Sequence, residues 1–128
     1  MRTGRRTESR AARQARQVFT ETVLARAGCE VQSLISHRCG GGYVDACHIL
    51  PKRFIRVETN TWSEPDRLAV LWNPANALRG CRTGHNLFDA PGHGGVGMAD
   101  LPGVVLVFAE RYGWVWKLEH IYRGRVVA

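Results

Sequence analysis

The stretch DACHILPK, Asp45–Lys52, decides the fold of this chain. It has the composition of a short β-strand that Pro51 ends, because proline cannot donate a hydrogen bond to a neighbouring strand. Cys47 and His48 stand where an ordinary strand carries Val or Ile, and both side chains can bind metal or exchange protons. The chemistry of the protein is therefore expected at the end of this strand.

The segments around this strand predict an α+β domain. Residues 29–35 have the pattern of a first strand, and the glycine-rich turn of residues 37–42 joins them to a second strand at 43–50, which predicts a β-hairpin. Apolar residues at helical spacing predict a helix over residues 9–27, with Ser9 as its cap. Further along, we expect irregular chain at 52–62, a helix at 64–71, a loop at 75–81, a helix at 82–89 and a helix starting at Pro102, followed by a tail that fits helix and strand equally.

The charge of the chain favours a polyanionic partner. Its 128 residues allow one domain, preceded by a basic segment at residues 1–8 that is expected to be disordered. The formal net charge is +7, and all but two of the eighteen basic residues are arginine, whose planar fork matches phosphate oxygens. The chain has neither a membrane-length apolar run nor a secretory signal pattern, so we expect an intracellular protein with reduced cysteines and no membrane partner.

A second group of polar residues follows in NALRGCRTGHNLFD, residues 76–89. His85 and Asp89 are four residues apart, so on a helix their side chains lie on one face, with Cβ atoms about 5–6 Å from each other. An imidazole and a carboxylate at that spacing can hold one divalent cation. Taken alone, the pair fits a surface ion pair equally well.

Together, these two motifs resemble the HNH nucleases, a family with the ββα-metal fold. Members carry a His near the end of the second strand in a D/H/A-H-I-x-P sequence, then an Asn in a loop, then a His nine residues after that Asn. Here these residues are His48 in CHILP, Asn76 in NALRG and His85 in GHNLFD, and the H-x-L-F-D ending typical of one subgroup places its Asp at Asp89. The resemblance covers about residues 27–90, which leaves 91–128 as a C-terminal extension of a single nuclease domain, residues 9–128.

The resemblance implies a metal-dependent DNA endonuclease that hydrolyses phosphodiester bonds. His48 would be the general base, because an imidazole can accept a proton from water near neutral pH. His85 and Asp89 would hold one divalent ion, Mg²⁺, Mn²⁺, Ni²⁺ or Zn²⁺, that stabilises the leaving oxygen. Asn76 would belong to the catalytic motif as the residue that braces the loop and orients the base. The residues expected to contact phosphates are Arg53, Arg56 and Arg82.

Cys47 departs from the family pattern. The residue before the base is commonly an Asp or His that binds the metal, and a thiolate in its place would favour zinc or another soft ion. Alternatively, Cys47 is a small buried hydrophobic residue. Asp45 lies two residues earlier, on the same face of the strand, and could supply the missing oxygen ligand. We expect Cys47 to lie close to the metal in either case.

The other cysteines raise the question of a second metal. Many HNH proteins hold a structural zinc with CxxC pairs, but here Gly84 stands where the second Cys of CRTGH would be. A Cys3His zinc site could still form from Cys29, His37, Cys39 and Cys81. Because the Cys29–Cys39 spacing is too long for a normal zinc knuckle, free buried thiols are the preferred expectation.

Two other functions fit part of the sequence. A non-catalytic, basic DNA-binding module with the same ββα shape would explain the charge, but a decayed site would be expected to lose His48 or His85 first, and both are present. An RNA-binding or ribosome-associated protein would explain the charge and not the motifs. A nuclease of this kind would fit phage DNA processing, a mobile element or host defence.

Overall fold

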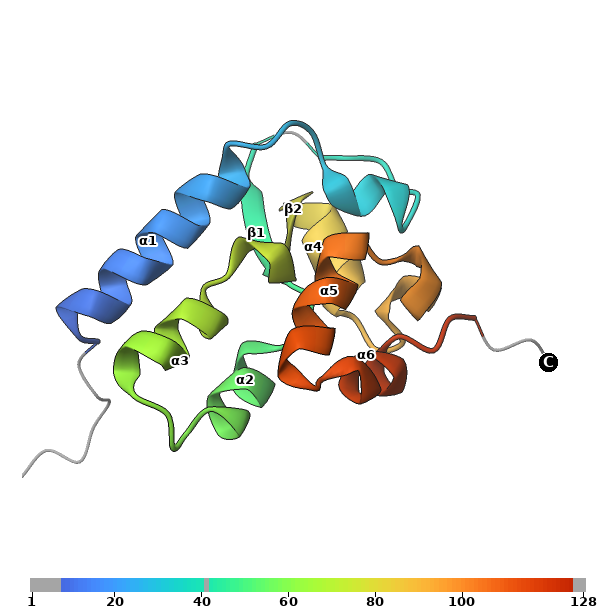
Figure 1. The fold of residues 1–128 in the computed structure, drawn as a ribbon. Coiled ribbons are helices and arrows are strands. Elements are labelled where there is room, and N and C mark those ends of the chain that lie inside the picture. The colour runs from blue at the N-terminus through green and yellow to red at the C-terminus, as the bar shows by residue number, and fades with distance from the viewer. Residues whose placement is uncertain (1–7, 41, 126–128) are drawn as a thin grey trace, which may run out of the picture.

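The described part of the chain, residues 8–40 and 42–125 of a computed structural model, has a mixed α+β fold with six α-helices and a two-stranded sheet (Figure 1). Strand β1, Val44–His48, pairs antiparallel with β2, Ala77–Cys81, so that His48 lies opposite Ala77. Helix α4, Arg82–Asp89, follows β2 directly. β1, β2 and α4 therefore follow one another as two strands and a helix, a ββα unit, but His48 lies on the first of these strands and not, as was predicted, on the second.

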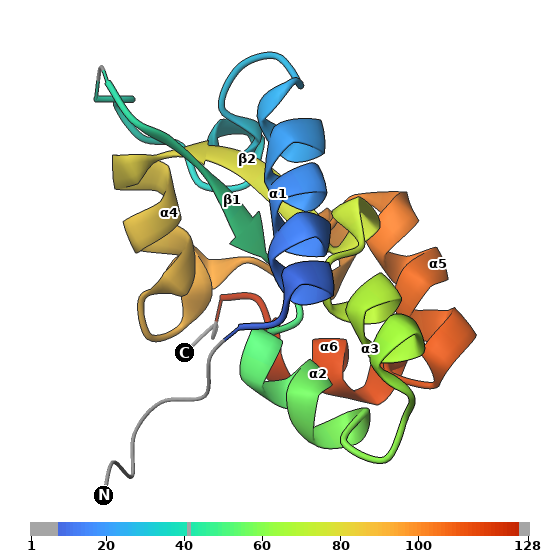
Figure 2. The same ribbon diagram turned by 90° about the vertical axis from the view of Figure 1, so that its left-hand side faces the viewer.

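Helix α1, Arg10–Leu24, confirms the predicted N-terminal helix. Ser9 caps it as expected, because its hydroxyl accepts a hydrogen bond from the N–H of Ala12 at 3.0 Å. The buried residues of α1, Phe19 and Val23, pack with Ala77 of β2. Figure 2 shows α1 and α4 on opposite sides of β1.

The predicted hairpin of residues 29–50 is wrong, because its first strand does not exist. Residues 30–33 form a single 3-10 turn, in which Val31 is buried and the carboxylate of Glu30 accepts a hydrogen bond from the N–H of Arg79 at 2.7 Å. The partner of β1 is instead β2, in the segment predicted as a loop. Residues 29–35 alternate between apolar and polar side chains, as a half-buried strand does, although they form no strand. β2 lacks this alternation because almost all of its residues are buried, and Gly80 within it is typical of a loop.

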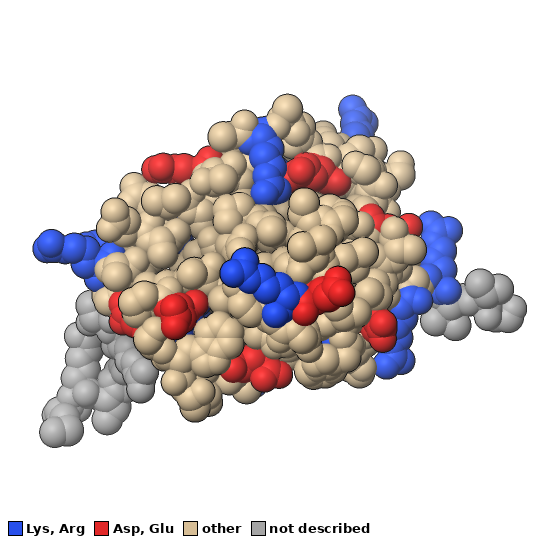
Figure 3. Space-filling model, viewed as in Figure 1, with Lys and Arg blue, Asp and Glu red and all other residues tan. Residues whose placement is uncertain are grey.

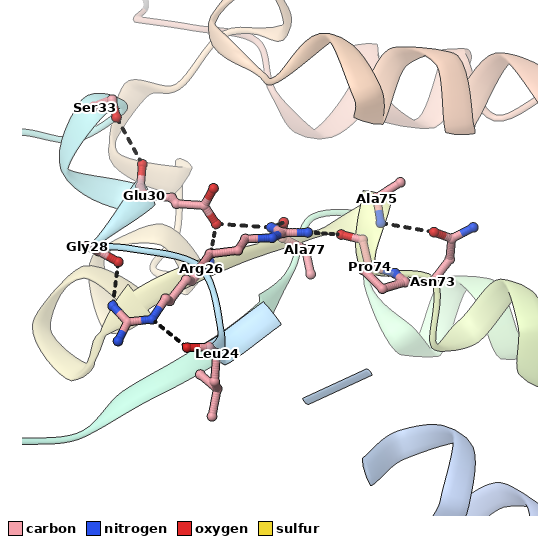
Figure 4. Close-up of polar contacts among 10 residues, drawn as sticks. Leu24, Arg26, Gly28, Glu30, Ser33, Asn73, Pro74, Ala75 and Ala77 are labelled. Atoms are coloured by element: carbon pink, nitrogen blue, oxygen red, sulfur yellow. Dashed lines mark hydrogen bonds and ion pairs between the residues drawn. The ribbon is translucent and has the colours of Figure 1, made fainter. Parts of the chain in front are cut away.

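Polar contacts fasten the end of α1 to β2 (Figure 4). The guanidinium of Arg26 donates to the Glu30 carboxylate and to the backbone carbonyls of Ala77 and Pro74, at 2.8–3.0 Å. Arg79 reaches back from β2 to the carbonyls of Leu24 and Gly28. These arginines bond backbone carbonyls inside the fold, so their role is structural.

Residues 49–76 form a long connection between the two strands. It contains α2, Lys52–Glu58, and α3, Glu64–Leu71, followed by a 3-10 turn at Pro74–Asn76. The α3 prediction is confirmed, with Ser63 as its cap. The irregular chain predicted at 52–62 is wrong because it contains α2, which lacks a side-chain cap and buries only Ile55.

The C-terminal part packs into the same core as the ββα unit. Pro102 precedes α5, Gly103–Tyr112, as predicted, and the ambiguous tail forms α6, Val115–Ile121. The hydroxyl of Tyr122 donates to the carbonyl of Ile49, directly after β1. None of the helices in the described residues has the length and apolar character needed to cross a membrane. The basic segment predicted to be disordered lies outside the described residues, except for Glu8.

Candidate active site and metal cluster

A hollow of about 280 Å³ lies along β1, between α1 and α4. Figure 2 looks toward this side of the protein, with β1 between the two helices. Asp45 and His48 of β1 line the hollow together with His85 of α4. Its basic lining residues are Arg16, Lys52 and Arg82. Two histidines that are far apart in the sequence therefore reach one concave site.

His48 is held in place by a backbone carbonyl and two aromatic rings. Its ring stacks on Phe19 of α1 at 4.8 Å between centroids and meets Trp72 edge-on at 5.5 Å. Its Nε2 lies 2.8 Å from the carbonyl oxygen of Leu71. Because a carbonyl can only accept, Nε2 carries the proton, and Nδ1 keeps the lone pair that could take a proton from water.

Burial lowers the pKa of His48 to about 4, because the charged imidazolium loses solvation between the aromatic rings. The bond to the Leu71 carbonyl opposes this shift, whereas the positive charges of Lys52 and Arg56 reinforce it. His48 is therefore neutral at physiological pH. Lys52 lines the hollow together with His48, where a phosphate could meet it.

His85 lies between two carboxylates. Its Nδ1 is 2.9 Å from Oδ2 of Asp45, and its Nε2 is 2.8 Å from Oδ2 of Asp89 on the next turn of α4. Arg82 also contacts the Asp45 carboxylate, at 3.3 Å. The helical spacing of His85 and Asp89 thus places a nitrogen and an oxygen together, as the sequence predicted.

This arrangement suits a divalent cation on the Asp89 side of His85. A carboxylate only accepts, so an imidazole bonded to two carboxylates needs a proton on each nitrogen. A metal bound by Nε2 and Asp89 would replace one of these protons, and Asp45 would then fix the ring through Nδ1–H, as carboxylates commonly do for metal-bound histidines. Asp45 is therefore better placed to orient His85 than to act as the alternative ligand.

Cys47 lies in the core rather than in the hollow. Its side chain has no exposed surface, and burial raises the pKa of its thiol to about 12. Its Sγ would lie 3.1 Å from a Cβ added at Gly80 of β2, so the sulfur packs against the neighbouring strand. This geometry favours the packed thiol over the metal ligand.

Asn76 braces the chain that follows His48. The residue is fully buried, and its side-chain amide accepts from the N–H of Leu50 at 2.7 Å and donates to the carbonyl of Leu50 at 3.0 Å. Its backbone carbonyl accepts from the N–H of Ile49. Asn76 therefore acts on the site by fixing the end of β1.

The three arginines predicted to bind phosphate differ in position. Arg82 lines the hollow, whereas Arg56 lines a neighbouring hollow of about 650 Å³ together with Trp72 and Arg67. Arg53 is exposed on α2 and lines neither. Arg16 lines the hollow from the arginine-rich face of α1, a face that could lie along a phosphate backbone. The sequence reasoning missed Lys52 and Arg67, although Lys52 directly follows CHILP and its position was a usable signal. It also missed the packing of Phe19 and Trp72 on His48, which local sequence gives no means of predicting.

The four residues considered for a structural metal site lie close together. The ligand atoms of Cys29, His37, Cys39 and Cys81 are all within 4.8 Å of one another, and the group could bind a metal such as zinc. The N–H of Gly84 bonds the sulfur of Cys81 at 3.2 Å and lowers the pKa of that thiol below its ordinary value. This proximity favours the metal site over unrelated buried thiols.

No protein-family model matches the chain, and no curated protein or solved structure matches it significantly. Membership of the HNH family therefore stays a prediction from the motifs. The functional conclusion rests on the hollow beside β1, with His48 and His85 in its lining, and on the Cys/His cluster.

Proposed function

We propose that this protein is a metal-dependent DNA endonuclease in which His48 is the general base. One observation carries the proposal: a neutral imidazole and a His–carboxylate pair line, or directly adjoin, the same hollow. Phosphodiester hydrolysis needs both elements, because water must lose a proton to attack and the leaving oxygen must be stabilised. The CHILP and HNLFD motifs supply both at positions that resemble the HNH family.

In this proposal, the residues around the hollow have separate roles. Nδ1 of His48 takes a proton from the attacking water, while the Leu71 carbonyl holds the ring through Nε2–H. His85 and Asp89 hold the divalent ion, and Asp45 orients His85. The ion, when bound, acts as a Lewis acid at the leaving oxygen. Asn76 positions the base indirectly through Leu50.

The charge distribution supports DNA as the substrate of this hollow. Arg16, Lys52 and Arg82 line it, and Arg56 lies in the adjoining larger hollow. On the face shown in Figure 3, on the side of α5, basic and acidic side chains are interspersed, so that face offers no continuous cationic surface. A phosphate backbone is therefore expected to run along the side of β1.

We assign the catalytic ion to His85 and Asp89 rather than to the Cys/His cluster. Four protein ligands would fill the tetrahedral shell of a metal in the cluster, which leaves no position for water or phosphate. A pair of ligands from α4 leaves most positions open, as catalysis requires. Nitrogen and carboxylate oxygen at this pair suit Mg²⁺, Mn²⁺, Ni²⁺ or Zn²⁺.

A plasmid-cleavage assay with each of these four ions tests the proposal. We expect cleavage by the wild type and none by His48→Ala, with Mn²⁺ binding retained in that variant by calorimetry. His85→Ala and Asp89→Ala should lose both cleavage and Mn²⁺ binding, whereas His120→Ala, an exposed histidine on α6, should change neither. The base assignment would be refuted if His48→Ala lost Mn²⁺ binding as fully as His85→Ala.

The non-catalytic DNA-binding module remains a second candidate, because one observation favours it. A base with a pKa of about 4 is weaker than the value near the working pH that general-base catalysis prefers. If the wild type binds duplex DNA in a salt-dependent way but does not cut it with any of the four ions, the module is the correct function. In that case His48 is a half-buried histidine that holds α1 and α3 together.

A further inference from the structure

We propose that Cys29, His37, Cys39 and Cys81 form a closed structural zinc site that fixes the start of α4 and thereby the position of His85. The zinc site itself does not depend on the proposed nuclease activity. It is carried by the geometry of the four ligand atoms and by the way the surrounding backbone accommodates them.

Nε2 of His37 lies close to all three sulfur atoms of the cluster. It is 3.6 Å from Sγ of Cys29, 3.5 Å from Sγ of Cys39 and 3.3 Å from Sγ of Cys81. The other ring nitrogen, Nδ1, contacts the carbonyl of Ile35 and must donate to it, which leaves the lone pair of Nε2 directed toward the three sulfurs. Structural zinc sites commonly hold their histidine in this way, with a carbonyl on the far nitrogen.

Backbone N–H groups support two of the three sulfurs. The N–H of Cys81 points to Sγ of Cys29 at 3.4 Å, and the N–H of Gly84 points to Sγ of Cys81 at 3.2 Å. Donors of this kind stabilise the thiolate form that binds zinc. Zinc binding needs no oxidant or reductant: each thiol that becomes a ligand releases one proton, up to three in total.

Gly84 explains how a histidine completes the site. A Cβ at this position would lie 2.9 Å from Nε2 of His37, so any larger residue would push the imidazole out of the cluster. Gly84 stands where the second Cys of a CxxC pair would be, and the missing ligand comes instead from His37 in the preceding loop. The absence of that Cys therefore changes the source of the fourth ligand without removing the site.

The zinc would connect two segments that lie far apart in the sequence. His37 and Cys39 lie in a stretch without regular structure, whereas Cys81 is the last residue of β2 and the cap of α4. His85 follows Cys81 by about one helical turn. A metal bond to Cys81 would therefore hold the loop against the core and fix the direction in which α4 presents His85.

Metal analysis of the purified full-length chain is the first test. We expect about one zinc per chain and, after cobalt substitution, the visible absorption of a tetrahedral cobalt–thiolate centre. Loss of one of four ligands in Cys39→Ser should weaken zinc binding at least as much as the loss of a partner that orients a ligand, which costs about 10–100-fold. Cys39 is exposed, so the substitution should spare the fold, and Cys47→Ala, a cysteine outside the cluster, should keep the full zinc content.

The proposal is overturned if the wild type takes up no stoichiometric zinc or cobalt, or if Cys47→Ala loses zinc while Cys39→Ser retains it. Neither measurement uses DNA, so the result stands apart from any failure to find cleavage. If Cys39→Ser does not fold, titration of the wild type with a zinc chelator and the cobalt spectrum still decide the question.

Hydrogen exchange tests the coupling to α4. Removal of zinc from the wild type should increase amide exchange in residues 29–40 and 82–89, and leave α5 protected. If the cluster does not hold α4 in place, the amide exchange rate of each of the three segments should be the same with and without zinc. That outcome would overturn the link between the metal and His85 even if the zinc itself were present.

Discussion

Replacement of Asn76 by alanine should be among the most damaging single changes in the connection between the strands. The side chain is fully buried, and both the oxygen and the nitrogen of its amide bond the backbone of Leu50, which is itself fully buried. In Asn76→Ala, the N–H and the carbonyl of Leu50 lose these partners in a place that water does not reach.

The expected loss follows from these two groups. A buried backbone group without a partner costs about 1–3 kcal/mol, so two of them cost about 2–6 kcal/mol, and the small cavity adds to this sum. The free energy of unfolding of a domain this size is about 5–15 kcal/mol. With an m-value of about 2 kcal/mol/M, a loss of about 4 kcal/mol would lower the urea midpoint by about 2 M.

Asn73 provides a matched control in the same turn. Its Oδ1 accepts a single bond, from the N–H of Ala75 at 2.9 Å, and the residue is partly exposed, so Asn73→Ala should cost only about 1 kcal/mol. Asn76→Asp keeps the acceptor but not the donor and buries a charge, so it should be at least as damaging as Asn76→Ala. The bracing role is wrong if urea unfolding gives Asn76→Ala and Asn73→Ala the same loss.

Three other measurements test separate parts of the structure. The pKa of His48 is about 4 in the folded protein and about 6.5 in the unfolded chain, so the unfolded state takes up the proton first as the pH falls. The free energy of unfolding should therefore decrease by roughly 3 kcal/mol between pH 6.5 and pH 4 because of His48. Denaturation at several pH values should show that His48→Gln loses less stability over this range; equal acid sensitivity would contradict the burial of a neutral ring. Gly80→Ala should lower the free energy of unfolding by about 1–3 kcal/mol, because the new Cβ would lie about 3 Å from two core side chains. Gly103→Ala in α5 has open space around it, so it should leave the melting temperature unchanged or raise it. Lys52→Ala and Arg56→Ala should each flatten the slope of log K against log salt for duplex DNA by about 1, and unchanged slopes would place the phosphates elsewhere.

The sequence predicted the residues of the candidate site better than the elements that carry them. His85 and Asp89 meet because helical spacing alone places them on one face, and this rule needs no tertiary information. Cys47 and His48 were placed on a strand correctly because Pro51 marks its end. What the sequence could not reveal was the strand that pairs with β1, since β2 contains Gly80 and is covered on both faces.

The contacts that hold His48 could not be predicted from the local sequence either. Its ring is held by Phe19 of α1 and by the carbonyl of Leu71 in α3, contacts that span the whole N-terminal half of the chain. The Cys/His cluster was considered but not preferred, because the Cys29–Cys39 spacing is too long for a normal zinc knuckle and Gly84 stands in place of a second Cys; the folded chain nevertheless brings Cys81 to the other three residues. Both sites depend on distant segments that only the folded structure brings together.

The connection formed by residues 49–76 also has a consequence for how this protein folds. A tight hairpin would close its strand pair at little entropic cost, whereas closing a loop of this length costs about 3 kcal/mol before any ladder bond forms. The pairing of β1 with β2 is therefore expected to follow the formation of α2 and α3, which shorten the distance to be closed. The residues of the candidate site would then come together late on the folding pathway, when Asn76 bonds Leu50 and closes the loop.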